Sequence, residues 1–219
     1  MLGTYAYNEI FRKTVIAFGT LFNNIEIRRA ATGATTEVMK VPLAYGPKDK
    51  FLARLAQAGT AEDRTTQITV PRISFEISGF SYDTTRKVAP TQIIRHVDSS
   101  DKTRKAFMPV PYNVDFELAI LAKNQDDGLQ ILEQILPIFQ PMFTVTINLV
   151  DAIGEKKDFP IILNGVSYDD DYEGDFTTRR TLIYTLTFSA KTYLYGPVPD
   201  VSSKVIKKSI VDTHLKVDT

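Results

Sequence analysis

Hydrophobic and polar residues alternate most regularly between Tyr112 and Val150, where they predict a strand, a helix and a second strand. From Val114 to Ile120 every second residue is apolar, which is the period of a strand with one buried face. Phe143 to Leu149 repeats that period. Between the strands, apolar residues recur every three or four positions, as on one face of a helix. They are Leu129, Leu132, Ile135, Leu136 and Phe139. We expect this unit to form part of the core.

Polar and helix-breaking residues set the ends of this predicted helix. Asn124, Asp126 and Asp127 offer side-chain oxygens to the free amides of the first turn, and negative charge suits that end of the helix dipole. Pro137 and Pro141 stop or kink the helix because proline has no amide hydrogen. The pair Asp126 and Asp127 is therefore better explained as a helix cap than as a pair of catalytic carboxylates.

The same two periods predict the other elements. They are helices over 7–23 and 48–58, and strands over 25–28, 37–45, 68–82, 159–168 and 177–195. Asn8 is a candidate cap of the first helix, and Pro47 suits the start of the second. Pro42 indicates an edge strand or a bulge, and Gly79 a bend or bulge. The sum is an α+β fold, with a mainly antiparallel β-sheet of about seven strands and about three helices.

Two segments lie outside this pattern. Residues 83–108 are basic and carry few apolar residues at a regular spacing, which predicts a long loop. The last 20 residues are polar with thin apolar alternation, and such a segment is suited to adding a strand to a neighbour's sheet edge. We therefore expect one domain over residues 1–198, with the long loop 83–108 inserted in it, and an extended C-terminal arm over 199–219.

Composition narrows the class of protein. The chain has 219 residues, of which 43% are hydrophobic and 24% charged, as in ordinary globular proteins. Its 26 basic and 26 acidic residues cancel, so net charge gives no argument for nucleic acid. The absence of cysteine excludes disulfides and thiolate chemistry. No apolar run approaches the ~20 residues that span a bilayer, and the start does not resemble a signal peptide. We expect a soluble protein with no membrane partner.

Candidate catalytic and metal-binding residues are few. His96 and His214 have no evident carboxylate to orient them. The acidic turn 169–175 matches the start of a calcium-binding loop, but Arg180 stands where that loop needs a bidentate glutamate, so a solvated hairpin loop is favoured. No phosphate-binding glycine motif is present. We expect no enzymatic activity, no metal site and no cofactor.

Basic residues of segment 86–105 and of the C-terminal arm are the candidate interaction residues. They and two interleaved apolar residues are Arg86, Lys87, Arg95, Lys102, Arg104, Lys105, Lys204, Ile206, Lys207, Lys208 and Ile210. These residues suit contact with nucleic acid or with an acidic protein face, and ordinary solvation explains them equally well. The scarcity of aromatic residues in both segments counts against a platform for base stacking.

The last signal is a set of short stretches that follow one another over most of residues 1–198. The stretches are Tyr7-Asn8, Phe11-Arg12, Leu21-Phe-Asn-Asn-Ile25, Ile27, Arg29, Val41-Pro42, Tyr45, 48–51, Pro71-Arg-Ile73, Phe80-Ser-Tyr82, Glu117-Leu118, Ile120, Asp126-Asp127, Gln130-Ile131, Glu133-Gln-Ile-Leu-Pro137, Phe139-Gln-Pro141, Arg179-Arg180 and Leu186-Thr-Phe188. As an ordered set they resemble the tail sheath stabiliser family, also called tail completion or tail terminator proteins, of T-even-like contractile-tailed bacteriophages.

The resemblance implies a structural virion protein without enzymatic activity or cofactor. Proteins of this family form a hexameric ring at the head-proximal end of the tail, where they terminate and stabilise sheath and tube and provide the neck and head-joining surface. The implied partners are copies of the chain itself, the tail sheath and tail tube proteins, and neck or connector proteins. DNA passes through the ring without implied specific binding. The implied location is the tail–neck junction of the virion, after synthesis in the host cytoplasm. The residues alone leave open an oligomeric DNA- or protein-binding module that uses loop 86–105.

Overall fold

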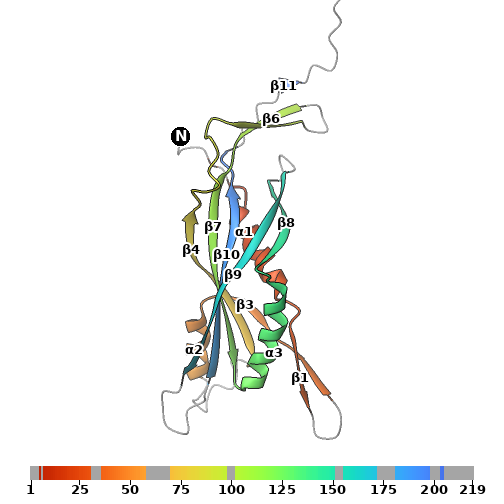
Figure 1. The fold of residues 1–219 in the computed structure, drawn as a ribbon, viewed down its shortest axis with the longest axis vertical. Coiled ribbons are helices and arrows are strands. Elements are labelled where there is room, and N and C mark those ends of the chain that lie inside the picture. Colours follow the sequence, from red (N-terminus) through yellow and green to blue (C-terminus); the bar gives the residue numbers. More distant parts are fainter. Residues whose placement is uncertain are drawn as a thin grey trace, which may run out of the picture.

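The computed structural model describes residues 5, 7–30, 36–57, 70–97, 102–150, 155–171, 181–197 and 203–204. This part of the chain is elongated and combines helices with three β-sheets (Figure 1). The helices are α1 (Ile10–Leu21), α2 (Lys48–Gln57), α3 (Gln125–Ile135) and the short 3₁₀ turn η2 (Leu136–Ile138). The predicted α+β class is confirmed.

Six strands form the main sheet, in the order β3–β4–β7–β10–β9–β8. They are β3 (Leu43–Tyr45), β4 (Arg72–Tyr82), β7 (Val110–Ala122), β8 (Met142–Val150), β9 (Glu155–Asp171) and β10 (Thr181–Leu194). Every neighbouring pair is antiparallel except β3 and β4, which are parallel. The mainly antiparallel sheet predicted from the alternation is therefore confirmed. Alternation worked because one face is buried along its length, including Val114, Phe116, Leu118 and Ile120.

Two smaller sheets extend the ends of the molecule. The hairpin of β1 (Glu26–Ala30) and β2 (Thr36–Lys40) lies at the lower end in Figure 1. At the other end, β5 (Ile93–Val97), β6 (Lys102–Phe107) and β11 (Ser203–Lys204) form a sheet in the order β11–β6–β5, here called the upper sheet. The prediction of a long loop over 83–108 is wrong, since β5 and β6 pair within it. The pattern gave no strand signal because, among the side chains of β5 and β6 that the structure describes, Ala106 alone is buried and Ile94 is half-buried.

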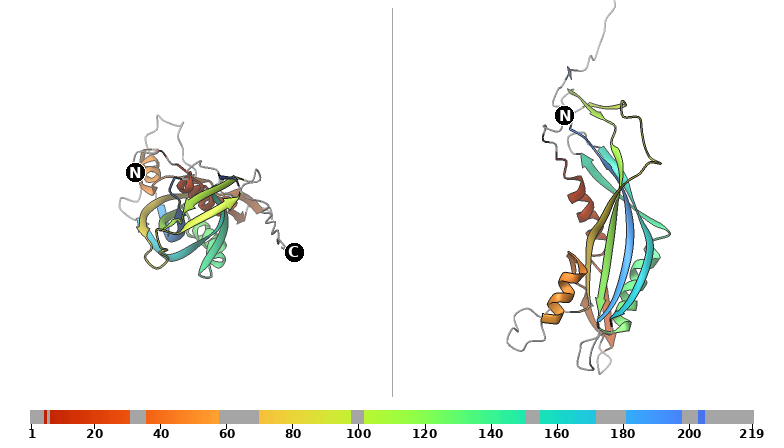
Figure 2. Two further views of the ribbon diagram at one scale, coloured as in Figure 1. Left: turned by 90° about the horizontal axis from the view of Figure 1, so that it is seen from above. Right: turned by 90° about the vertical axis from the view of Figure 1, so that its left-hand side faces the viewer.

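Helix α1 lies in the opening of the curled main sheet (Figure 2). It contacts strands toward both edges of that sheet. Phe18 is fully buried, and its ring lies 5.4 Å from that of Phe75 on β4 and 5.3 Å from that of Phe188 on β10. Toward the last strand, Lys13 Nζ donates to the backbone oxygen of Leu149 on β8 at 3.4 Å. The helix thus completes a core that the sheet alone leaves open.

Helix α3 packs on the same sheet with a face that only partly matches the predicted stripe. Leu129 and Leu136 are 43% and 38% exposed, whereas Ile131, absent from the predicted stripe, is fully buried. Leu132, Ile135 and Phe139 are buried as predicted. A Cβ added at Gly128 would collide with the ring of Tyr184 on β10, so the helix backbone lies directly on that ring. This close approach fixes the rotation of α3 and turns Ile131 inward.

Side-chain caps do not form where the sequence predicts them. Helix α1 begins after Glu9, whose φ of 54° is left-handed and whose side chain makes no capping bond. Asn8 is not the cap, because its Nδ2 donates instead to the backbone oxygen of Tyr195 at 3.3 Å. Asn124 occupies the N-cap position of α3 without a side-chain capping bond. Asp127 is not a cap either, since its carboxylate binds an arginine on β1.

Predictions made from proline and glycine fare better. The register of β4 against β7 shifts between Ile77 and Gly79, which confirms the bulge. Pro47 directly precedes α2, as predicted. Pro42 divides the predicted strand 37–45 into β2 and β3, and β3 lies at the edge of the main sheet.

Candidate interaction site

Arg86, one of the predicted interaction residues, fastens the base of the upper sheet to the main sheet. Its Nε donates to Asp83 Oδ2 at 2.6 Å, and its Nη2 donates to Asn113 Oδ1 at 2.8 Å and to the backbone oxygen of Tyr112 at 3.2 Å. The guanidinium also lies 4.9 Å from the ring centre of Tyr193 on β10. The donors of Arg86 are thus engaged within the chain, which suits positioning of the upper sheet.

Asp83, which the sequence reasoning missed, is the acceptor in this anchor. Thr85 donates to Asp83 Oδ1 from its hydroxyl at 2.6 Å and from its backbone amide at 2.9 Å. These hydrogen bonds and the contact with Arg86 hold the pKa of Asp83 well below its ordinary value. The short spacing Asp83-x-Thr85 is a local turn signal that could have revealed it.

The upper sheet sets basic residues opposite one another. Its three strands, IIRHV, KTRKAF and SK, contain no acidic residue. Arg95 and Lys105 are both exposed, and neither has an ion-pair partner among the described residues. Directly opposed like charges destabilise a pair of strands. The basic register pairs are Arg95–Lys105, His96–Arg104 and Lys102–Lys204.

The two faces of the β5–β6 hairpin differ in character. On one face, Ala106 and Ile94 join a buried cluster with residues of α1, β8 and β10. On the other, Ile93 and Phe107 stand opposite each other and are 49% and 59% exposed. Since side chains two residues apart share a face, Arg95 and Lys105 flank this apolar pair. The outer face therefore offers apolar and cationic groups together.

The other predicted interaction residues are placed less fully. Lys87 is exposed in the turn after Arg86. Lys102 and Arg104 lie on β6 and Lys204 on β11, but their side chains are outside the described part. Ile206, Lys207, Lys208 and Ile210 lie outside the described residues altogether. Their role in an interface stays a prediction.

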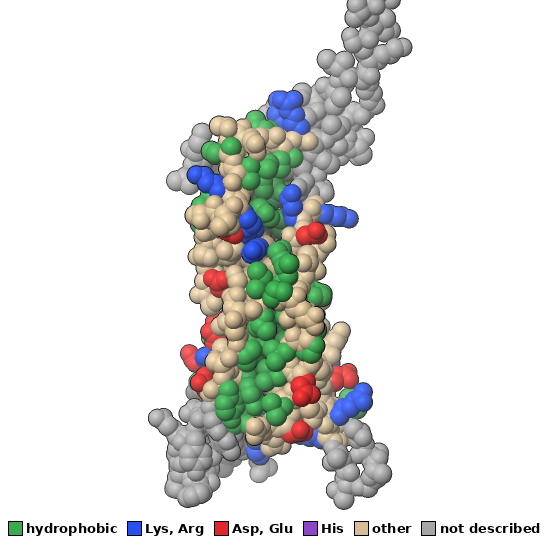
Figure 3. Space-filling view, viewed as in Figure 1, with side chains coloured by type: hydrophobic (Ala, Val, Ile, Leu, Met, Phe, Trp, Pro, Cys, Tyr) green, Lys and Arg blue, Asp and Glu red, His purple; other side chains and the backbone are tan. Residues whose placement is uncertain are grey.

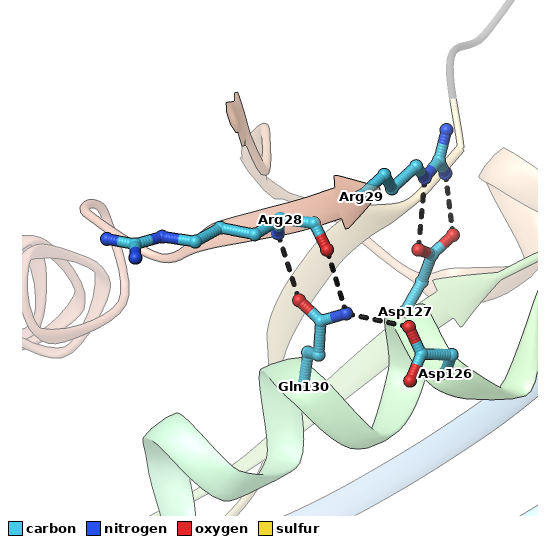
Figure 4. Close-up of polar contacts among 5 residues, drawn as sticks. All are labelled: Arg28, Arg29, Asp126, Asp127 and Gln130. Carbon is cyan, nitrogen blue, oxygen red and sulfur yellow. Dashed lines mark hydrogen bonds and ion pairs between the residues drawn. The ribbon is translucent and has the colours of Figure 1, made fainter. Parts of the chain in front are cut away.

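A second polar arrangement joins the lower hairpin to α3 (Figure 4). Arg29 Nη2 donates to Asp127 Oδ2 at 2.6 Å and Arg29 Nε donates to Asp127 Oδ1 at 3.1 Å. Asp127 is only 1% exposed. The hydrogen bond to Asp127 raises the pKa of Arg29, so the pair stays charged. This pair explains the buried carboxylate at the start of α3.

Two glutamines of α3 cover the outer edge of β1. Gln130 accepts from the amide of Arg28 at 2.9 Å through Oε1 and donates to the Arg28 carbonyl at 3.0 Å and to Asp126 at 2.7 Å through Nε2. One turn later, Gln134 donates to the Glu26 carbonyl at 2.7 Å and accepts from its amide at 3.4 Å. These side-chain amides satisfy the edge as a neighbouring strand would.

Large apolar side chains are exposed on both flanks of the main sheet. On the β4 flank, Phe11 and Phe80 are exposed with ring centres 4.9 Å apart, and Tyr82 is exposed next to them along the strand. At the opposite end of the sheet, Ile138 of η2 and Met142 of β8 are exposed. The space-filling view also shows apolar side chains in a stripe along the long axis (Figure 3). Such surfaces mark contacts with other proteins.

Evidence for reaction chemistry is lacking in the described residues. They contain no group of three or more histidine, aspartate or glutamate side chains that could hold a metal ion. None of the helices placed by the structure is long and apolar enough to cross a membrane. Of the acidic turn 169–175, residues 172–175 lie outside the described part, as do the side chain of His96 and all of His214.

The described surfaces offer exposed apolar and cationic groups of the kind that protein partners contact. A family-level comparison identifies the class of protein: the family described as the T4-like virus Myoviridae tail sheath stabiliser matches residues 5–219. The chain belongs to this tail sheath stabiliser family. It is a structural protein of contractile phage tails, and it is not an enzyme.

One curated relative agrees with this family. The chain is 32% identical over 219 residues to "Tail completion protein gp15" of Enterobacteria phage T4, covering 96% of this chain and 79% of the relative. Among solved structures, the PVC sheath/tube terminator of an extracellular contractile injection system, in its extended state, is 11% identical. That match has a TM-score of 0.35, too low to define a shared fold, and covers 98% of this chain and 66% of the other. The comparisons do not support the alternative of a DNA-binding module.

Proposed function

We propose that copies of this chain form a closed hexameric ring at the head-proximal end of the tail. There the ring terminates and stabilises sheath and tube and provides the surface to which the neck is joined. The proposal is supported by membership of the tail sheath stabiliser family and by the similarity to a tail completion protein. The implied partners are the tail sheath, tail tube and neck proteins.

The observation that carries the proposal is the pair of exposed apolar flanks. A cyclic ring is built from head-to-tail contacts, so each subunit needs two different surfaces that complement each other. Phe80 and Tyr82 lie on the β4 flank, and Ile138 and Met142 lie on the β8 flank. Figure 1 places β4 and β8 on opposite sides of the molecule. Contact between the two flanks of adjacent subunits buries apolar groups that are exposed in the single chain.

The two small sheets lie away from these flanks, at the two ends of the long axis (Figure 1). In a ring whose axis follows the long axis of the subunit, these ends face the layers on either side. We therefore assign contacts with the neighbouring virion proteins to the upper sheet, with Lys87, Arg95 and Lys105, and to the basic residues of the C-terminal arm. Arg86 positions that surface, because its donors are engaged within the chain.

Light scattering of the purified protein tests the ring. Six chains of 24.6 kDa make a particle of about 148 kDa. Phe80→Glu places a charge on the β4 flank and is expected to reduce the mass toward that of one chain. Val38→Glu changes an equally exposed apolar residue on the lower hairpin and is expected to leave the mass unchanged. Equal masses for wild type and Phe80→Glu, both assembled, contradict the assignment of the flank.

Deletion from the phage tests the function itself. We expect tails made without this protein to lose sheath subunits from one end and to remain unjoined to heads, as counted by electron microscopy. Complementation with the wild-type chain restores both, and complementation with Phe80→Glu does not. Stable full-length tails joined to heads in the absence of the protein would overturn the proposal.

A further inference from the structure

We propose that the outer face of the β5–β6 hairpin docks an acidic surface of another virion protein. The docking residues are Arg95, Lys105, Ile93 and Phe107. This inference rests on the proposed function, because it assumes that the end of the subunit carrying the upper sheet faces a neighbouring layer. It adds the chemistry of the partner, which neither the family nor the relatives define.

The first argument is the unbalanced charge of the hairpin. Arg95 and Lys105 stand directly opposite each other in the register of the two strands. No acidic residue lies in the three strands, and residues 93–107 as a whole carry four Lys or Arg side chains against two aspartates. Like charges in this relation repel, so the single chain bears a cost. An acidic surface placed against the hairpin offsets this repulsion and adds attraction between opposite charges.

The second argument is that the face is held in one orientation. Ile94 and Ala106 pack into the cluster beneath the hairpin, so their neighbours Ile93 and Lys105 must face outward. Met108 donates its amide to the carbonyl of Gln92 at 3.0 Å, which closes the base of the hairpin. The Arg86 anchor fixes the preceding segment to β7 and β10. A prearranged surface loses little conformational entropy on binding.

The third argument separates a protein partner from nucleic acid. Protein interfaces combine an apolar centre with charged residues around it, and the exposed pair Ile93–Phe107 beside Arg95 and Lys105 has this composition. Binding to a phosphate backbone needs cations but gains nothing from an exposed isoleucine. Stacking of bases needs several aromatic rings, and Phe107 is the one aromatic residue of the three strands.

The distribution of charge on one face of the molecule agrees. On the face shown in Figure 3, Lys and Arg side chains gather in the upper half and most Asp and Glu side chains in the lower half. The whole chain has zero net charge, so this separation gives the two ends different partners. The end with the upper sheet fits an acidic surface.

A photo-crosslinker placed on the face identifies what it touches. The probe is p-benzoylphenylalanine in place of Phe107, an exposed aromatic residue, in protein supplied to a phage that lacks its own copy. After irradiation of assembled particles, we expect a crosslink to a different virion protein, at a segment rich in Asp and Glu. If the probe at Phe107 prevents incorporation, the same probe in place of Ile93 samples the same face.

Charge reversal then tests the chemistry. Arg95→Glu together with Lys105→Glu should lower the crosslink yield roughly tenfold, because attraction between opposite charges becomes repulsion. The matched control is Lys50→Glu together with Arg54→Glu on α2, which makes the same charge change among exposed residues outside the upper sheet. The control should stay within about twofold of wild type.

Other results overturn the inference. Crosslinks to DNA, crosslinks only between copies of this chain, or no crosslink in particles that contain the probe each contradict an acidic protein partner. So does an unchanged yield after charge reversal. Incorporation of the probe-bearing chain at the tail end is counted separately in the same particles, so a failed docking face and a failed tail-terminating function give different results.

Discussion

The guanidinium of Arg29 on β1 and the carboxylate of Asp127 on α3 form a pair of parallel hydrogen bonds across 98 positions of sequence. Asp127 is almost completely buried, while Arg29 reaches the surface. The lower hairpin is therefore linked to the body of the protein through the carboxylate of Asp127, and loss of its arginine partner would strongly destabilise the fold.

The first prediction concerns the removal of Arg29, the partner of Asp127. Arg29→Ala should lower the free energy of unfolding by about 2 kcal/mol, because it leaves a buried carboxylate without its charged donor. Arg29→Lys should recover part of the loss, since a lysine cannot supply two parallel bonds. Chemical denaturation measures both. Arg28→Ala is the control, because only the backbone of Arg28 is used by α3, and a loss equal to that of Arg29→Ala contradicts the assignment.

The second prediction concerns the covered edge of β1. Gln130→Ala should make amide exchange at Arg28 about fivefold faster, because the amide loses an acceptor worth about 1 kcal/mol. Glu133→Ala changes an exposed residue on the same helix and should leave Arg28 unaffected. Hydrogen exchange followed residue by residue gives the answer, and unchanged protection of Arg28 in Gln130→Ala would refute the role of the side-chain amide.

A third prediction tests the rotation of α3. Ile131→Ala should cost about 2–5 kcal/mol, because it leaves a cavity in the core. Leu129→Ala, two residues away on the exposed face, should cost less than about 0.5 kcal/mol. Equilibrium unfolding of the two variants is the measurement. A reversed order means that α3 buries the stripe expected from its sequence.

Glu76 gives a prediction with a defined pH dependence. Burial raises the pKa of Glu76, and the carboxylate of Glu117, opposite it on β7, raises it further. The charged form is thus disfavoured in the folded protein, and Glu76 costs stability at neutral pH. Below the ordinary glutamate pKa of about 4.3 the group is protonated in both states and the cost vanishes.

Glu76→Gln should therefore stabilise the protein at pH 7 by up to about 1 kcal/mol, and this gain should disappear near pH 3. Thermal unfolding at several pH values measures it. Glu133→Gln, at an exposed helix position, should show no such trend. A gain of the same size at both ends of the pH range argues against a change of charge as the cause.

The contribution of Asp83 to stability depends on pH in the opposite direction. Its lowered pKa means that the charged form is favoured in the folded protein, so its contribution is present at neutral pH. The contribution is lost as the pH falls below the ordinary aspartate value of about 3.9 toward the folded pKa. Asp83→Asn should accelerate amide exchange in β5 and β6 at pH 7, and the difference from wild type should shrink in acid. A constant difference would show that the carboxylate acts by shape alone.

Much of the main sheet could be predicted because its strands bury one face over a long stretch. Val114 to Ile120 and Leu182 to Phe188 show the strand period plainly, and their alternate residues are buried. The bulge at Gly79 followed from the conformational freedom of glycine, and the start of α2 after Pro47 from the fixed φ of proline. Local chemistry was sufficient where it met no competing contact.

Several failures come from contact between distant parts of the chain. The rotation of α3 depends on Tyr184, which lies far along the sequence from Gly128. Asp127 does not cap the helix, because its carboxylate pairs with Arg29. The strands β5 and β6 have a different cause, since their sequences show no apolar period. Of the predicted interaction residues, Arg86 is engaged inside the chain, a fact that its charge alone does not indicate.

The position of α1 has a consequence for the kinetics of folding. The helix is made early in translation. Asn8, just before it, nevertheless bonds to Tyr195 across 187 positions, and the buried face of the helix packs against β8 and β10. Contacts of such sequence separation make folding slow, because loop closure must precede the contacts that reward it. A nascent chain cannot finish its core until β10 has left the ribosome. We therefore expect the main sheet and its core to be completed only after most of the chain has been synthesised.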